Sequence, residues 1–97
     1  MKTKVFIITR FITFAYETIK PMDKELFKEF LNTVPLELFR IKGWVRFAEK
    51  TQMLNFVGGK IEWQEWPDTV NTCLAFIGWD VIEEPILEKL SQRIVRT

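Results

Sequence analysis

The 97-residue chain carries 14 lysines and arginines against 13 aspartates and glutamates, which gives a formal net charge of +1, and 47% of its residues are hydrophobic. A chain of this length fits one domain with a core large enough to fold without cross-links. Its near-neutral charge supplies no long-range field for polyanions, which argues against bulk binding to nucleic acid or to an anionic membrane surface. The single cysteine, Cys73, cannot form an internal disulfide and indicates a reducing, cytoplasmic location.

The first predicted element is a strand over Val5–Tyr16. This segment is rich in isoleucine, phenylalanine, valine and threonine, and it is apolar at both odd and even positions. Its apolar opening is interrupted at Arg10, which is too early for a signal peptide, and no 18-residue apolar run exists that would span a membrane. We therefore expect a largely buried strand and no export or membrane segment.

The second predicted element is a helix between Asp23 and Pro35. Asp23 is a good N-cap, and Pro35 ends the helical pattern. The apolar residues that recur at helical spacing are Leu26, Phe27, Phe30, Leu31 and Val34. We expect this apolar stripe to lie on a sheet.

Four more strands are predicted, at about Leu36–Phe47, Met53–Val57, Ile61–Trp66 and Thr72–Trp79. Because few residues join them, neighbouring strands are expected to pair antiparallel, since a parallel return needs a crossover of about a dozen residues. Gly58 and Gly59, followed by Lys60, lack the leading glycine and the Ser/Thr of a phosphate-binding loop, so they predict a tight turn.

A final helix is predicted to begin near Glu83, Glu84 and Pro85, which suit a helix N-terminus. It would bury Ile86, Leu87, Leu90 and Ile94. The predicted fold class is therefore α+β, with a mainly antiparallel four- or five-stranded sheet, two helices packed on one face, and the element order β-α-β-β-β-β-α. No linker, repeat or low-complexity tract divides the sequence, so residues 1–97 are expected to form a single domain.

Hydrophobic and cationic side chains alternate within Leu38–Phe47. One parity carries Phe39, Ile41, Val45 and Phe47, and the other carries Arg40, Lys42, Trp44 and Arg46. Because successive side chains of a strand point to opposite faces, the segment predicts one buried face and one cationic, aromatic face. We take the second set as the candidate interaction face.

The sequence offers little support for catalysis. It contains no histidine, which removes the usual general base and the commonest zinc ligand. Asp80, Glu83 and Glu84 could hold a hard cation such as magnesium, but acidic groups at a helix N-terminus also complement its dipole and cap its free amides. Cys73, inside an apolar run, is interpreted as a small buried hydrophobe. We expect no enzymatic activity, no metal site and no cofactor.

Tryptophans and cations share the predicted strands, at Trp44, Trp63, Trp66 and Trp79 and at Arg40, Lys42, Arg46 and Lys60. These side chains could cover a sheet face by packing on one another, or they could anchor a protein interface. A third interpretation is base stacking on an open sheet, because KGWVRF is close to an RNA-binding signature. The signature's internal Gly-Phe step is missing, and the neutral charge also counts against RNA.

The order of these motifs resembles the C-terminal domain of the CobW family of GTPase metallochaperones. That domain typically has a Pro-hydrophobic-Asp helix start, an R-x-K-G strand, a strand ending in V-G-G, a tryptophan-containing strand and F-I-G-x-D before its last helix. The matching residues here are Pro21, Met22, Asp23, Arg40, Lys42, Gly43, Phe56, Val57, Gly58, Gly59, Trp66, Phe76, Ile77, Gly78 and Asp80. The similarity runs from about Phe11 to Leu90, and Trp79 departs from it where the family often has a basic residue.

In that family the domain follows a GTPase domain with a cysteine-based metal site, and the two together are thought to deliver zinc, cobalt or related ions. The resemblance therefore implies a non-catalytic accessory domain that binds protein, with a CobW-type GTPase domain in cis or in trans as its partner. Two alternatives stay open. One is a self-associating structural module that forms a homodimer through an exposed strand edge or through the tryptophan face. The other is a module that binds RNA on its sheet face. The sequence also leaves open whether the chain is an independent protein or an excised domain.

Overall fold

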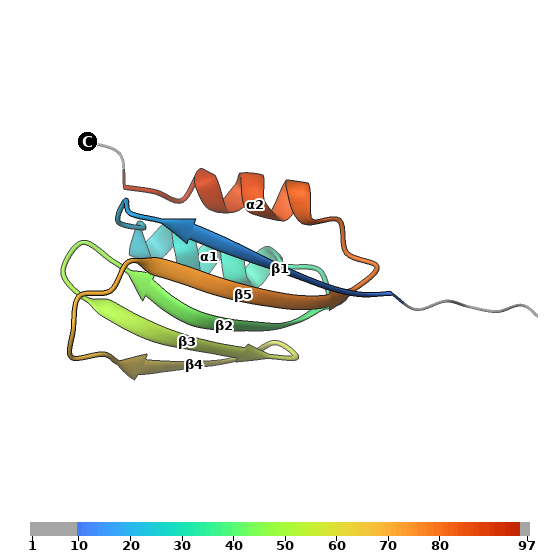
Figure 1. The fold of residues 1–97 in the computed structure, drawn as a ribbon, viewed down its shortest axis with the longest axis horizontal. Helices are drawn as coiled ribbons and strands as arrows, with labels where there is room; N and C mark the ends of the chain where they lie inside the picture. Colours follow the sequence, from blue (N-terminus) through green and yellow to red (C-terminus); the bar gives the residue numbers. More distant parts are fainter. Residues whose placement is uncertain (1–9, 96–97) are drawn as a thin grey trace, which may run out of the picture.

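The structure is a computed structural model that describes residues 10–95. Its elements are β1 (Phe11–Thr18), α1 (Lys24–Thr33), β2 (Leu38–Arg46), β3 (Thr51–Val57), β4 (Lys60–Glu65), β5 (Thr72–Trp79) and α2 (Glu83–Ser91) (Figure 1). The predicted element order and the α+β class are confirmed. The part of the first predicted strand over residues 5–9 lies outside the described residues.

The five strands form one antiparallel sheet in the order β1-β5-β2-β3-β4. The predicted antiparallel pairing is correct for β2 with β3 and for β3 with β4, but β4 does not pair with β5. Instead the chain passes across the sheet, and β5 enters between β1 and β2 (Figure 1). The compositions explain this order, because Thr72–Trp79 carries no charged residue and suits a central strand, whereas Lys60–Glu65 carries charges on both faces and suits an edge.

Two buried threonines hold the segment that crosses the sheet. The hydroxyl of Thr51 donates to the carbonyl of Val70 at 2.8 Å and accepts from the Val70 amide at 3.0 Å. The hydroxyl of Thr72 accepts from the amide of Arg46 at 2.9 Å. Each threonine is only 1% exposed, so these hydrogen bonds satisfy buried polar groups and fix residues 66–71 against the ends of β2 and β3.

Helix α1 begins as the sequence predicts. The carboxylate of Asp23 accepts a hydrogen bond from the amide of Leu26 at 2.9 Å, which is an N-cap. Of the predicted apolar stripe, Phe27, Phe30 and Leu31 are buried on the sheet. Leu26 is wrong as a core residue because it is 36% exposed, on the first turn beside the cap.

Helix α2 is confirmed at its predicted place, but its start differs from the expectation. Its N-cap is Ile82, and no side chain caps it, so the acidic residues of the first turn do not close the free amides as predicted. Ile86 and Leu90 are buried, whereas Leu87 is half-buried. Ile94 lies beyond the helix and forms an isolated antiparallel bridge with Met22. Within residues 10–95 neither helix is long and apolar enough to cross a membrane.

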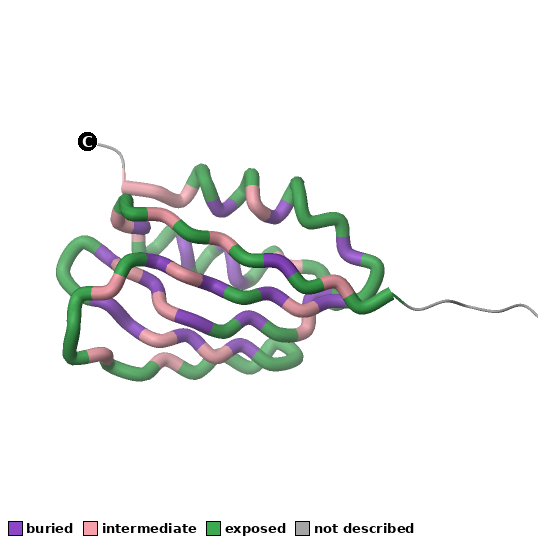
Figure 2. The backbone as a smooth tube through the Cα atoms, viewed as in Figure 1, coloured by how far each residue is buried: buried purple, intermediate pink, exposed green. Residues whose placement is uncertain are grey.

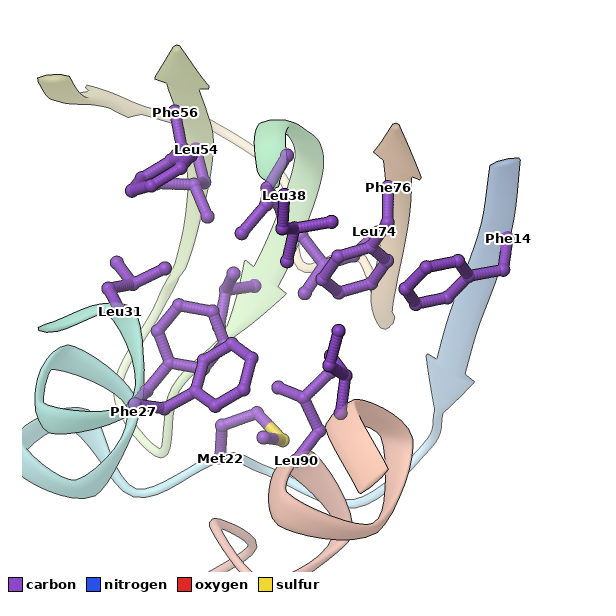
Figure 3. Packing of buried hydrophobic residues seen from close by; sticks show 14 of the residues in the cluster. Phe14, Met22, Phe27, Leu31, Leu38, Leu54, Phe56, Leu74, Phe76 and Leu90 are labelled. Atoms are coloured by element: carbon purple, nitrogen blue, oxygen red, sulfur yellow. The ribbon is translucent and has the colours of Figure 1, made fainter. Parts of the chain in front are cut away.

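The core lies between one face of the sheet and the two helices. Figure 3 shows Phe14, Phe76, Leu74 and Leu54 pointing from the strands toward Leu90 of α2 and toward α1. The rings of Phe14 and Phe76, on adjacent strands, stack with centroids 4.8 Å apart. Buried and less buried residues alternate along β5 and β2, as Figure 2 shows, so only one face of the sheet enters this core.

Glycine is required at the turn between β3 and β4 and in the middle of β2. Gly58 and Gly59 have φ of 55° and 88° and form the two-residue turn between β3 and β4, which confirms the predicted tight turn. Gly43, in the middle of β2, has φ of 146°, and a Cβ added there would lie 2.0 Å from the carbonyl oxygen of Cys73 on β5. Gly43 therefore sets how closely the backbones of β2 and β5 approach.

Replacing this glycine should separate the two strands. We expect Gly43→Ala to lower the free energy of unfolding by about 3 kcal/mol or more, because the added methyl group collides with rigid backbone. Gly59→Ala is the matched control, since a Cβ there meets open space and costs only about 1–2 kcal/mol of left-handed strain. Urea unfolding of both variants measures the difference, and equal losses would show that the approach at Gly43 is not limiting.

An ion pair at the β4 edge makes a prediction about pH. The carboxylate of Glu65 accepts from Lys50 Nζ at 2.8 Å and from Gln52 Nε2 at 3.1 Å, and these bonds hold the pKa of Glu65 below its ordinary value of 4.5. Because the folded-state pKa is depressed, this contribution to stability is present above pH 4.5 and is lost as the pH falls through the folded-state pKa.

We expect Lys50→Met to raise the pKa of Glu65, because it removes the stronger of the two hydrogen bonds. Lys60→Met is the control, since Lys60 pairs with Glu62 at 3.7 Å and not with Glu65. Carboxyl-carbon NMR titration gives the pKa directly. A Glu65 pKa that is the same in both variants would contradict the assignment.

Candidate functional site

The face of the sheet that points away from the helices is the candidate site, and we call it the open face. It consists of the odd-numbered residues of β1, β3 and β5, the even-numbered residues of β4, and the even-numbered residues of β2 from Arg40 onward, as the strand registers show. Within residues 10–95 no helix packs on it. An uncovered sheet face of this kind presents its side chains to solvent or to a partner.

Two of the predicted interface residues are free to meet a partner. Arg40 and Lys42 are exposed on the open face, and neither forms a salt bridge or a side-chain hydrogen bond within the described chain. Across β5 their neighbours are Ile77 and Ala75, so no carboxylate faces them from that strand. The two cations therefore remain uncompensated above small and apolar side chains.

Arg46 lies on the same face but has a structural role. Its guanidinium donates to the carbonyl of Ile19 at 2.9 Å and to the side-chain oxygen of Asn71 at 3.1 Å. These contacts tie the end of β2 to the loop after β1 and to the segment that crosses the sheet. The structure thus places Arg46 with the predicted set and shows that its charge is already hydrogen-bonded.

Trp44 forms an aromatic pair at this end of the open face. Its ring meets that of Trp66 edge to face, with centroids 5.6 Å apart and an angle of 68° between the planes. Met53 and Cys73 flank Trp44 on the neighbouring strands. Its buried indole Nε1 has no hydrogen-bond partner within residues 10–95. Half-buried and held by its neighbours, Trp44 is a preformed part of the surface.

A second aromatic group, Phe11, Phe39 and Trp79, occupies the other end of the open face, and we call it the aromatic corner. The ring of Trp79 meets Phe11 at 5.4 Å and Phe39 at 6.0 Å, both edge to face. Phe11 is 66% exposed and Trp79 is 47% exposed. The sequence analysis did not predict this group. Phe11 and Trp79 are both odd-numbered residues of strands that pair with each other, and this alternation would have placed them on one face.

The prediction that Phe39 points into the core is wrong. The pairing of β2 with β5 shifts between Leu38 and Arg40, which is a bulge or irregularity in the ladder. Leu38 fills the core position, and Phe39 joins the open face beside Arg40. The inserted residue reverses the alternation at this point. Ile41, Val45 and Phe47 are buried as predicted.

Two other residues also differ from their predicted environment. Trp63 does not share a face with the cations, since its ring packs on the helix side against Phe27 and Phe47 at 5.9 and 5.7 Å. Cys73 is half-buried on the open face, not deep in the core, and its thiol donates to Glu17 Oε1 at 3.5 Å. Burial, with the Glu17 carboxylate beside it, raises the pKa of this thiol above 9.0, which disfavours the reactive thiolate.

The motif residues shared with the family mostly shape the backbone. Besides the three glycines described above, Gly78 lets β5 end against β2, because an added Cβ would lie 2.9 Å from the carbonyl oxygen of Glu37. Asp80 adopts φ of 48°, and its amide donates to the Arg10 carbonyl at 3.0 Å. Among the motif positions with side chains, Arg40, Lys42, Val57 and Ile77 lie on the open face.

The acidic residues around α2 do not assemble a metal site within the described chain. No group of three Asp, Glu, Cys or His side chains gathers there at ligand distances. The carboxylate of Asp80 accepts instead from the amide of Arg10, at 3.4 Å.

Solved structures resemble this fold. The zinc(II)-bound YjiA GTPase from E. coli matches with a TM-score of 0.72 and 20% identity, over 88% of this chain and 30% of that one. A zinc(II)-bound triple mutant of YjiA GTPase matches with a TM-score of 0.68 and 19% identity over the same shares. The chain thus spans less than a third of the length of either GTPase. No protein with a curated description matches it in sequence.

The sequence itself carries the stronger finding. Residues 11–94 match the family described as the cobalamin synthesis protein cobW C-terminal domain, which includes every strand and helix of the fold. The R-x-K-G strand, the V-G-G turn and the F-I-G-x-D segment all lie inside the match. The chain therefore belongs to the CobW C-terminal domain family.

Proposed function

We propose that the chain is a non-catalytic accessory domain that binds a CobW-type GTPase domain, in cis or in trans, and takes part in GTP-dependent trafficking of zinc or cobalt in the cytoplasm. Two findings support this proposal. The matched family is the cobW C-terminal domain, and the zinc(II)-bound YjiA GTPase contains a region of the same fold over 30% of its chain. In that arrangement nucleotide chemistry belongs to the partner domain, and this chain supplies a binding surface.

The observation that carries the proposal is the pair of uncompensated cations on the open face. Arg40 and Lys42 stand between the aromatic corner and Trp44, and they have no carboxylate partner within residues 10–95. Arginine and tryptophan are favoured interface anchors, and a lysine beside them adds attraction to an acidic surface. A partner with carboxylates on a mainly apolar patch would neutralise both cations and cover the aromatic rings.

The proposed docking can be tested by reversing these charges. We expect the double variant Arg40→Glu, Lys42→Glu to weaken binding to a CobW-type GTPase domain at least tenfold, and to abolish any effect of the chain on GTP turnover. The control is Lys28→Glu, which changes the charge of an exposed residue on α1, away from the open face. Titration calorimetry and a GTP hydrolysis assay give the two readouts.

Alkylation of Cys73 gives a further readout, because this thiol lies on the open face beside Trp44. Docking should slow its reaction with iodoacetamide at pH 9 in the unsubstituted chain and in the Lys28→Glu control. If the unsubstituted chain neither binds the GTPase domain nor alters its turnover, the proposal fails. Loss of binding in the control as great as in the double variant would place the interface elsewhere, and tight binding to single-stranded RNA would favour the RNA-binding alternative.

A further inference from the structure

We propose that the outer edge of β1 is a self-pairing edge, through which two copies of this chain join antiparallel into one continuous sheet. The occupant of the edge is thus a second copy of the same strand. This inference uses backbone groups of Phe11–Thr18 and none of the side chains assigned to GTPase docking. It therefore stands or falls independently of the proposed function.

The backbone of β1 leaves one set of hydrogen-bonding groups unused. The carbonyl of Arg10 accepts from the amide of Asp80, so Arg10 directs its backbone toward β5. Along an antiparallel ladder the backbone N–H and C=O groups of every second residue point toward the same neighbour. The backbone groups of Ile12, Phe14, Tyr16 and Thr18 therefore point toward β5 as well. The N–H and C=O groups of Phe11, Thr13, Ala15 and Glu17 then point outward, and no strand of residues 10–95 pairs with them.

No strand of residues 10–95 pairs with this edge, and the backbone groups of its outward residues make no loop or turn hydrogen bond there. Figure 3 shows Leu90 of α2 on the core side of the sheet, below Phe14 and Phe76. The side chains of Phe11, Thr13, Ala15 and Glu17 are all exposed. An incoming strand can therefore approach in the plane of the sheet.

The two edges of the sheet are protected very differently. β4, at the opposite edge, carries three charged side chains in six residues, and all three form ion pairs, Lys60 with Glu62 and Glu65 with Lys50. Charges of this kind are the usual guard against pairing with another chain. β1 is eight residues long, has no proline and carries one charged residue, Glu17. Of the two edges, β1 is the one suited to accept a strand.

The sequence of β1 selects one register for self-pairing. Paired residues must share a face, and pairing Thr13 with Ala15 of the second copy engages all four outward residues of both copies. This register places Phe14 opposite Phe14 and Ile12 opposite Tyr16, on the side of the sheet that carries the core. Both cross-strand pairs are apolar or aromatic, which is favourable in an antiparallel sheet.

The two neighbouring registers are less favourable. Moving the register by two residues so that Ala15 faces Ala15 would bring Arg10 toward Lys20 of the second copy, which is repulsive. Moving it the other way, with Thr13 facing Thr13, leaves the outward groups of Glu17 without a partner among residues 10–95.

A charged residue on the edge should prevent the dimer. We expect Ala15→Lys to raise the dissociation constant of the dimer at least tenfold, as measured by analytical ultracentrifugation over a range of concentrations, because it places two lysines at the centre of the pairing. The matched control is Gln64→Lys, an exposed open-face position on β4 at the opposite edge. Thr13→Lys is a second variant should Ala15→Lys fail to fold, with circular dichroism as the check.

Cross-linking tests the register. In a background of Cys73→Ser, chains with Thr13→Cys are mixed with chains with Ala15→Cys under mild oxidation. Hydrogen-bonded antiparallel pairs have Cα atoms about 5.5 Å apart, within disulfide range. We expect disulfide dimers that contain one chain of each kind.

The outcomes separate clearly. Mixed disulfides, with a dimer that survives Gln64→Lys and is lost in Ala15→Lys, support the proposal. A chain that stays monomeric at millimolar concentration overturns it. A dimer that Ala15→Lys leaves intact, or disulfides formed as readily by either variant alone, also overturns it. None of these results bears on binding to a GTPase domain.

Discussion

The close approach of β5 to Gly43 is the contact on which the rest of the sheet depends. The carbonyl of Cys73 occupies the space that a side chain at position 43 would need, so β2 and β5 can pair only because this residue is glycine. That pairing joins the β2-β3-β4 hairpins to β1 and fills the centre of the sheet with an uncharged strand. The core between sheet and helices, and the open face behind it, both follow from this junction.

Local patterns in the sequence predicted most elements of the fold, because the responsible forces act between near neighbours. The Asp23 cap, the Gly58–Gly59 turn and the bounds of Thr72–Trp79 each depend on a few adjacent residues. The position of β5 between β1 and β2, away from β4, could not be predicted from such local patterns. It depends on which strand is uncharged enough for the centre and on hydrogen bonds of Thr51 and Thr72, made with residues 19 and 26 positions away.

The candidate site was predictable to the same degree and for the same reason. Alternation places Ile41 in the core and Arg40 and Lys42 outside, but it cannot reveal an inserted residue, so Phe39 was assigned to the wrong face. Nor does periodicity show what a long side chain will contact. Arg46 falls on the predicted face and yet is bound to Ile19 and Asn71, while Trp63 is covered by Phe27 of a helix about 36 residues earlier in the chain.

Charge is distributed unevenly over the sheet, and this distribution separates the open face proposed for GTPase docking from the β1 edge proposed for self-pairing. On β4 the charges pair within the chain, on β2 Arg40 and Lys42 stay uncompensated, and β1 is nearly free of charge. Binding through side-chain charges on a face weakens with added salt, whereas pairing through backbone hydrogen bonds at an edge is much less sensitive to salt. Because paired antiparallel strands keep their faces aligned, edge-to-edge pairing would set two open faces on the same side of one sheet. A partner that binds one pair of cations would then meet a second pair at high effective concentration, which strengthens attachment without any new contact.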